Sequence, residues 1–295
     1  GLSITVLSVV NQYNHQLVPL LDYPSSAPAW ASAMNHSYRP DDFNLKQRTL
    51  PYSHGGKTNP LANLAVIHGT NAITVDRSIL QLTLSVSTAI IANEPTLTSY
   101  DQICGDGDCG LVLRKGGEKV KELIEELLQK EEKKEIDLTS INVVVFLNLI
   151  ADTISASMGG TSGALLELFF RAMSNYLSDK YRGVKDSDVG NITVVKRDWI
   201  EAYDKGIAAI KFYGGAEQGM RTMLDALIPA LHQLQEDENI VKASHKAKEG
   251  VEATKFMEGL AGRCNYIDRN LMNNTPDPGA YAIAVAFQVI ADTFI

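Results

Sequence analysis

The spacing of hydrophobic residues predicts helices from about residue 76 to the end of the chain. Apolar residues recur there at intervals of three and four, which is the spacing of one helix face. The predicted helices cover about 76–93, 111–134, 138–157, 160–181, 196–212, 217–236, 239–260 and 279–294. No strand pattern alternates with these helices, so the sequence predicts an all-α domain over residues 76–295.

Two of the predicted helices have contrasting surfaces. The helix over 111–134 has one apolar stripe, which consists of Val120, Leu123, Ile124, Leu127 and Leu128. Its other face carries Lys and Glu side chains, which we interpret as a solvated helix face and not as a binding site. The helix over 138–157 is apolar over much of its circumference, which is typical of a central helix.

The first 75 residues follow a different pattern. Leu2, Ile4 and Val6 alternate with other residues in a short run that predicts a β-strand. Because one strand cannot bury itself, we expect residues 1–30 to be the end of a preceding α/β domain and the sequence to be a piece of a longer chain. Residues 31–75 are polar and rich in Pro and Gly, which is typical of an interdomain linker.

Composition narrows the function classes. The formal net charge of −8 argues against non-specific nucleic-acid binding, which usually needs a basic face. No stretch reaches the roughly 18 apolar residues of a membrane span. The three cysteines are sparse and odd in number, and the N-terminus lacks a basic signal-peptide region. We therefore expect a cytoplasmic protein without nucleic-acid or membrane partners.

One acidic loop, residues 104–110, concentrates the candidate chemistry. Asp106 and Asp108 stand between glycines in this loop, and Asp101 lies just upstream. Carboxylate oxygens suit hard cations such as Mg²⁺, and a cation would relieve the repulsion between three acids. A solvated turn that caps the next helix is the alternative, and the loop alone leaves both readings open. An EF-hand is excluded, because no Gly-x₅-Glu completion follows.

A second glycine-rich loop, residues 157–163, precedes the fourth predicted helix. Gly159, Gly160, Thr161 and Ser162 place small residues and hydroxyls at the helix start. Free N–H groups and the positive end of the helix dipole favour phosphate there. Helix capping by Thr161 or Ser162 is the simpler reading of this loop alone.

Two more loops carry candidate ligands. In the loop after Gly214, Arg221 offers a planar fork for phosphate, Thr222 a hydroxyl and Met223 an apolar surface for a flat ring. A glycine-rich connection with Met223 in the core is the alternative. In the last loop, Arg263 is another phosphate candidate. This loop ends with an expected N-cap, Asp277, and a first-turn proline, Pro278.

Taken in order, the four loops resemble the nucleotide-binding L domain of dihydroxyacetone kinases, over residues 76–295. Residues 1–30, which include Ala27-Pro28-Ala29-Trp30, resemble the end of the K domain of that family. The resemblance implies a barrel of eight antiparallel helices whose loops at one end hold ATP and Mg²⁺. By the same resemblance, Asp101, Asp106 and Asp108 would bind two Mg²⁺ ions.

The resemblance also implies a set of nucleotide-binding residues. This set consists of Asp108, Cys109, Gly110, Leu111, Gly159, Gly160, Thr161, Ser162, Gly214, Arg221, Thr222, Met223, Arg263, Asp277, Pro278 and Gly279. The chain departs from the family pattern at three places. Leu111-Val112 stands where two threonines are common, Met220 where an Asp is common, and Cys264-Asn265 where an Ala-Ser pair is common.

The function implied is ATP-dependent phosphorylation of dihydroxyacetone and glyceraldehyde, with a K domain in the same chain or a partner holding the triose. The family K domain binds its substrate through a histidine and forms a homodimer. None of the six histidines here lies in a matching context, so the chain alone is expected to be inactive. Three alternatives remain: a non-catalytic nucleotide-binding or regulatory fragment, an FAD-AMP lyase that forms cyclic FMN at the same site, and an L subunit that holds ADP for a phosphocarrier protein.

Overall fold

The computed structural model describes residues 75, 77–136, 142–182, 194–272 and 274–294 of the 295-residue chain. All of these residues belong to one compact unit, Asn59–Ile295. No strand element occurs among them, which confirms the all-α prediction for this part of the chain. The strand expected within residues 1–30 lies outside the described residues, and so does the expected linker except for Val75.

The described residues form nine α-helices and two short 3₁₀ helices. In chain order these are α2 (Arg77–Ala92), α3 (Glu94–Cys104), α4 (Cys109–Glu132), α5 (Val143–Ser157), α6 (Gly160–Lys180), α7 (Lys196–Gly214), α8 (Leu224–Asp237), α9 (Ile240–Thr254), η7 (Arg263–Tyr266), η8 (Arg269–Leu271) and α10 (Pro278–Thr293).

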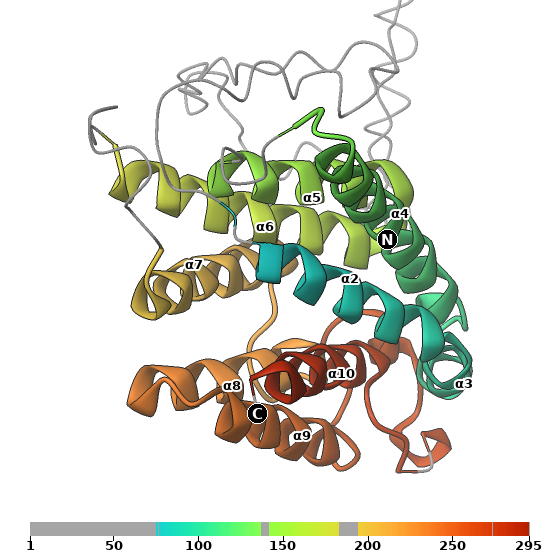
Figure 1. Ribbon diagram of the computed structural model, residues 1–295. Coiled ribbons are helices and arrows are strands. Elements are labelled where there is room, and N and C mark those ends of the chain that lie inside the picture. Colours follow the sequence, from blue (N-terminus) through green and yellow to red (C-terminus); the bar gives the residue numbers. More distant parts are fainter. Residues whose placement is uncertain (1–74, 76, 137–141, 183–193, 273, 295) are drawn as a thin grey trace, which may run out of the picture. The chain divides into compact units, whose positions relative to one another are not determined.

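Eight of the helices close into a ring by their mutual packing, which Figure 1 shows from the side. Going round it, α2 packs on α4, then α5, α6, α7, α8, α9 and α10 follow, and α10 packs back on α2. The remaining helix, α3, continues from the end of α2 and packs on α4 and α10. The eight-helix barrel implied by the family resemblance is therefore confirmed.

The core follows the predicted hydrophobic faces. On α4, the stripe residues Val120, Leu123, Ile124 and Leu127 are buried. The opposite face of α4 carries exposed Lys–Glu ion pairs, in agreement with a solvated surface. Eight residues of α5 are buried, which fits the central position predicted for that helix. None of the helices in the described part of the chain is long and apolar enough to cross a membrane.

The predicted boundaries failed at three places. The helix predicted over 239–260 ends already at Thr254. The pattern missed α3, a helix with few apolar residues that starts anew because Pro95 suits a first helical turn. The helix predicted over 217–236 begins only at Leu224. Its predicted first turns are interrupted by positive φ angles of 93° at Gly219 and 62° at Arg221, which a helix does not tolerate.

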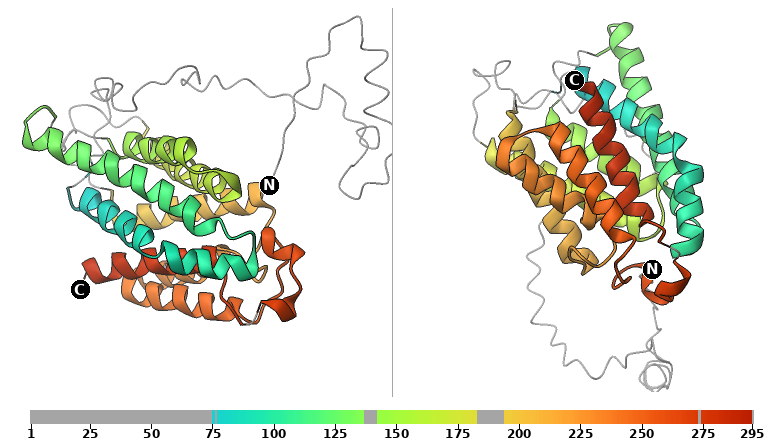
Figure 2. Two further views of the ribbon diagram at one scale, coloured as in Figure 1. Left: turned by 90° about the vertical axis from the view of Figure 1, so that its right-hand side faces the viewer. Right: turned by 90° about the horizontal axis from the view of Figure 1, so that it is seen from below.

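The ring places the four glycine-rich loops together. Neighbouring helices joined by short connections run in opposite directions, so every second connection lies at the same end of the barrel. The connections α3–α4, α5–α6, α7–α8 and α9–α10 therefore gather at one end, which is the right-hand end in the left view of Figure 2. These connections contain the candidate residues for metal and nucleotide.

Candidate functional site

Three carboxylates converge at the acidic loop between α3 and α4. One oxygen from each of Asp101, Asp106 and Asp108 lies within 4.8 Å of the others, which is a spacing that one cation can bridge. Asp101 is buried on the last turn of α3, whereas Asp106 and Asp108 are exposed on the loop. The three residues named from the sequence are thus brought together, and their donor set fits Mg²⁺.

Backbone contacts fix the shape of the acidic loop. Asp101 Oδ2 accepts a hydrogen bond from the Cys109 N–H at 2.9 Å, which joins the end of α3 to the start of α4. A Cβ atom at Gly105 would lie 2.2 Å from Asp101 Oδ1, so only glycine lets the loop approach this carboxylate so closely. Gly107 turns the chain with a φ of 80°. The loop is therefore built around the Asp101 carboxylate.

The acidic loop concentrates negative charge, of which one nearby cation compensates a part. Burial raises the pKa of the Asp101 carboxyl above its usual value, the Cys109 N–H opposes this shift, and the charges of Asp106 and Asp108 raise the pKa further. One cation is already near, because Arg263 Nη2 lies 3.1 Å from Asp106 Oδ2. The phosphate candidate Arg263 therefore joins the acidic loop from the α9–α10 connection.

The start of α6 is open and lacks a side-chain cap. Gly159 is the N-cap residue, and no side chain forms a capping hydrogen bond there. Helix capping by Thr161 or Ser162 is therefore wrong as an explanation of this loop. A Cβ atom at Gly159 or Gly160 would meet nothing within 4 Å, and Thr161 is exposed. The first-turn N–H groups of α6 are thus positioned to receive an anion.

The loop before α8 is organised by a residue that the sequence analysis missed. The buried carboxylate of Asp225 accepts hydrogen bonds from the N–H groups of Gly219 and Thr222, the second at 2.8 Å. The Thr-x-x-Asp spacing of a helix-start capping box was the signal that could have identified it. Met223 lies beside the start of α10, because a Cβ atom on Gly279 would lie 3.5 Å from Met223 Cβ.

Arg221 does not lie on the surface of this site. Its side chain is 1% exposed, and its guanidinium donates to the Thr275 carbonyl at 2.6 Å and to Cys104 Sγ at 2.9 Å. A third contact is made with Met272 Sδ. The Arg221 guanidinium, which the sequence analysis expected to bind phosphate, therefore lies in the interior. Its N–H groups donate to protein atoms there.

The last loop ends as the sequence predicted. Asp277 is the N-cap of α10, its Oδ1 accepts from the Ala280 N–H at 2.7 Å, and Pro278 occupies the first turn. Burial raises the pKa of Asp277 to about 7, against the opposing effects of the Ala280 N–H and the Arg221 charge. The Asp277 carboxyl is thus a buried structural group that caps α10.

The departures from the family pattern have clear positions. Leu111 is 46% exposed at the start of α4, next to the acidic loop. The Met220 carbonyl accepts from the Leu260 N–H at 3.2 Å and so joins the last two loops. Cys264 is buried against Cys104 and Met272 beneath the site, and Asn265 is exposed.

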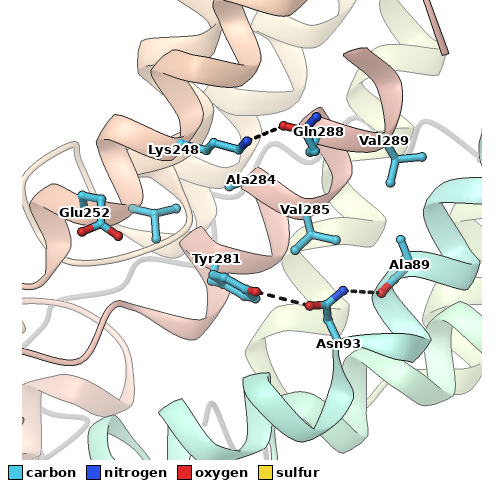
Figure 3. Close-up of a pocket in the computed structure, with 10 residues that line it drawn as sticks. Ala89, Asn93, Lys248, Glu252, Tyr281, Ala284, Val285, Gln288 and Val289 are labelled. Atoms are coloured by element: carbon cyan, nitrogen blue, oxygen red, sulfur yellow. Dashed lines mark hydrogen bonds between the residues drawn. The ribbon is translucent and has the colours of Figure 1, made fainter. Parts of the chain in front are cut away.

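A separate cavity of about 570 Å³ lies between α2, α9 and α10 (Figure 3). Tyr281 donates to Asn93 Oδ1 at 3.3 Å on one side, and Lys248 donates to Gln288 on the other. Its lining residues include none of the candidate metal or nucleotide residues. The candidate site is therefore the loop end of the barrel and not this cavity.

Comparison with known proteins agrees with this architecture. The DAK2 domain pattern matches residues 103–292. A putative 3,4-dihydroxy-2-butanone kinase from Solanum lycopersicum is 29% identical over 300 residues, which cover 99% of this chain and 45% of the relative. A triokinase/FMN cyclase from Rattus norvegicus is 28% identical over 300 residues, with the same two coverages.

A solved structure has the same fold. The dihydroxyacetone kinase from C. freundii, in complex with AMP-PNP and Mg²⁺, matches with a TM-score of 0.56 and 26% identity, over 82% of this chain and 36% of that chain. The present chain thus spans less than half the length of the relatives that it matches. Because the domain match covers most of the chain and contains all four loops, the chain belongs to the DAK2 domain family.

Proposed function

We propose that this chain supplies the Mg²⁺–ATP site of a phosphotransferase that acts on dihydroxyacetone and glyceraldehyde. The observation that carries the proposal is the cluster of Asp101, Asp106 and Asp108 at the same barrel end as the uncapped start of α6. The similarity to a dihydroxyacetone kinase solved with AMP-PNP and Mg²⁺ supports it.

The three acids would hold Mg²⁺, and the bound metal would neutralise phosphate charge during phosphoryl transfer. Asp101 is suited to a fixed ligand, because burial and the Cys109 N–H hold its carboxylate in place. Asp106 and Asp108 are suited to adjustable ligands, since both are exposed on a glycine-rich turn. This combination of one fixed and two adjustable ligands fits a metal that is bound together with a nucleotide.

The phosphates would lie between the acidic loop and the start of α6. The backbone N–H groups of Thr161 and Ser162 would donate to phosphate oxygens, assisted by the helix dipole. Arg263 is exposed and held by one surface ion pair, so it can turn from Asp106 to a phosphate at low cost. Positioning and charge neutralisation of this kind account for most of the catalysis in phosphoryl transfer.

The flat base would rest on the apolar surface beside Met223 and Gly279. The backbone of Gly214 and of the turn Asp277–Gly279 would frame it. Cys109, Gly110 and Leu111 would contribute the first turn of α4, which begins directly after Asp108.

The acceptor would be bound by a K domain, in the same chain or in a partner. The curated relatives are more than twice as long as the matched region, which leaves room for such a domain. We further propose that the complete protein is a homodimer through its K domain. A cytoplasmic location is supported by the three cysteines, all of which are free thiols.

A second candidate activity is the splitting of FAD into AMP and cyclic FMN. The name of the rat relative, triokinase/FMN cyclase, favours it. Both reactions need a site for an adenine nucleotide and a metal beside its phosphates, so the same loops would serve.

An activity assay separates these candidates. The chain is mixed with a separately expressed K domain of a dihydroxyacetone kinase and supplied with Mg²⁺ and either ATP and triose or FAD. We expect triose phosphate to form, and Asp108→Asn to lower the rate about 100-fold. Glu122→Gln, on the solvated face of α4, is the matched control. Formation of cyclic FMN without triose phosphate would support the second activity. If neither product forms, the result would support a non-catalytic nucleotide-binding role.

A further inference from the structure

Arg221 is a buried cation beneath the candidate site. Its side chain is 1% exposed, and among the described residues its Nε–H has no hydrogen-bond partner. Its backbone has a φ of 62°, a strained conformation for a residue with a Cβ atom. A buried charge with an unpaired donor and a strained backbone costs free energy, so packing alone does not explain an arginine here.

The guanidinium joins two loops that are far apart in the sequence. Its donor to Cys104 reaches the last residue of α3, three residues after the buried metal candidate Asp101. The same nitrogen donates to the Thr275 carbonyl, two residues before the N-cap Asp277. One planar group thus fixes the end of α3 against the approach to α10.

The connection continues to the ligand-facing residues on both sides. Asp101 is tied to the start of α4 through the Cys109 N–H, and Gly279 lies against Met223. A shift at Arg221 would therefore move the metal-binding carboxylates relative to the surface expected to carry the base. The Cys104 thiol also donates directly to the Pro276 carbonyl, but at 4.0 Å this contact is long, so the shorter hydrogen bonds between these two parts are those of the Arg221 guanidinium.

We propose that Arg221 is a positioning residue that couples the metal ligands of the acidic loop to the nucleotide-framing residues before α10. This proposal rests on the function proposed above. Arg221 acts through Cys104 and Thr275 and does not itself touch the metal or the nucleotide. Its consequence is that Mg²⁺ and nucleotide each strengthen the binding of the other, because both need the same arrangement of the two loops.

The test measures this coupling in variants of Arg221. The affinity for AMP-PNP is determined by calorimetry with and without Mg²⁺, and the ratio of the two is the coupling. Arg221→Met keeps the length of the side chain and removes its donors, and we expect it to reduce the ratio about tenfold. Arg221→Lys keeps the charge but lacks the planar guanidinium, so its coupling ratio should lie between those of Arg221→Met and wild type.

A buried residue at another part of the barrel serves as the control. Leu177→Ala on α6 lowers the melting temperature but should leave the ratio unchanged. A purely structural role would make Arg221→Met behave in the same way, and that result would overturn the proposal. If Arg221→Met does not fold, Met272→Leu and Cys104→Ala each remove one contact of the guanidinium and should each reduce the ratio.

Hydrogen exchange tests the link without any ligand. In Arg221→Met, or in the single-contact variants, amide protection should fall together in residues 101–110 and 274–280 and stay unchanged in α5. Unchanged protection in both loops would overturn the proposal even if the wild-type chain binds no nucleotide. If the variants lose amide protection in both loops but the wild-type chain binds no nucleotide, the result would count against the proposed function and not against this proposal.

Discussion

Arg263 Nη2 lies 3.1 Å from Asp106 Oδ2, so the residue expected to meet a phosphate is paired with one expected to bind the metal. The two residues are 157 positions apart in the chain and come from different loops. Both side chains are more than one third exposed, and such pairs contribute only about 0–1 kcal/mol. The pair therefore compensates charge in the free protein and can be exchanged for metal and phosphate.

Substitution of Arg263 should affect metal and nucleotide in opposite directions. In Arg263→Gln the cation that competes at Asp106 is gone, so Mn²⁺ alone should bind up to about fivefold more tightly. The nucleotide loses a charged donor and should bind about tenfold more weakly. Electron paramagnetic resonance of free Mn²⁺, with and without AMP-PNP, measures both. Arg182→Gln, which removes an exposed ion pair with Asp179, is the control. If the Mn²⁺ and AMP-PNP affinities of Arg263→Gln change in the same direction, the result would contradict an exchange of the Arg263–Asp106 pair for metal and phosphate.

A pair of glycine substitutions tests how the acidic loop is built. The Cβ atom in Gly105→Ala would collide with Asp101 Oδ1, so the buried carboxylate would have to leave its place in the cluster and its hydrogen bond with the Cys109 N–H. We expect Mn²⁺ affinity to fall at least about tenfold. Gly159→Ala meets no atom within 4 Å and should leave metal binding unchanged. Equal Mn²⁺ affinities in the two variants would refute this role of Gly105.

Asp225 should be important for stability. In Asp225→Asn an amide N–H replaces a carboxylate oxygen, so one of the N–H groups of Gly219 and Thr222 loses its acceptor. We expect the free energy of unfolding to fall by about 1–3 kcal/mol in urea titrations. Asp204→Asn, which changes an exposed carboxylate on α7, should have little effect. A wild-type value for Asp225→Asn would show that the turn does not depend on this carboxylate.

Asp277 should make the stability depend on pH. Its pKa is about 7 in the folded protein, mainly because of burial, against 3.8 in an unfolded chain. Between these values the folded state keeps a proton that the unfolded chain releases, so the free energy of unfolding falls as pH rises through this window.

The Asp277→Asn variant tests this pH dependence, since asparagine can still cap α10 but cannot titrate. The free energy of unfolding of the variant minus that of wild type should increase by roughly 2 to 3 kcal/mol between pH 5 and pH 8, because only the wild-type value falls through the titration of Asp277. Urea unfolding across that range measures the difference. Parallel pH profiles of the two proteins would mean that Asp277 titrates near its ordinary pKa.

The sequence predicted helices best where one apolar face was clear. The stripe of α4 and the apolar surface of α5 set their places in the core. The short helix α3 has no such stripe, and its start depends on a proline. The start of α8 depends on a turn held by the buried Asp225, whose burial local spacing does not reveal.

The candidate site was predicted residue by residue only where the chemistry is local. Asp101, Asp106 and Asp108 lie within eight positions, and the cap at Asp277 follows a short sequence rule. The position of Arg221 depended on Cys104 and Thr275, which lie 117 and 54 positions away. A charged residue is usually exposed, so its burial could not be predicted without these tertiary partners.

Calorimetric titration of AMP-PNP into this chain, with and without Mg²⁺, tests the central claim most directly. Asp108→Asn is the sharpest variant, because the Asp108 side chain makes no capping hydrogen bond, and Glu122→Gln is its control. We predict binding with Mg²⁺ that weakens at least about tenfold without the metal and in Asp108→Asn. Absence of binding by the wild-type chain, or equal binding with and without Mg²⁺, would contradict a metal–nucleotide site at the acidic loop.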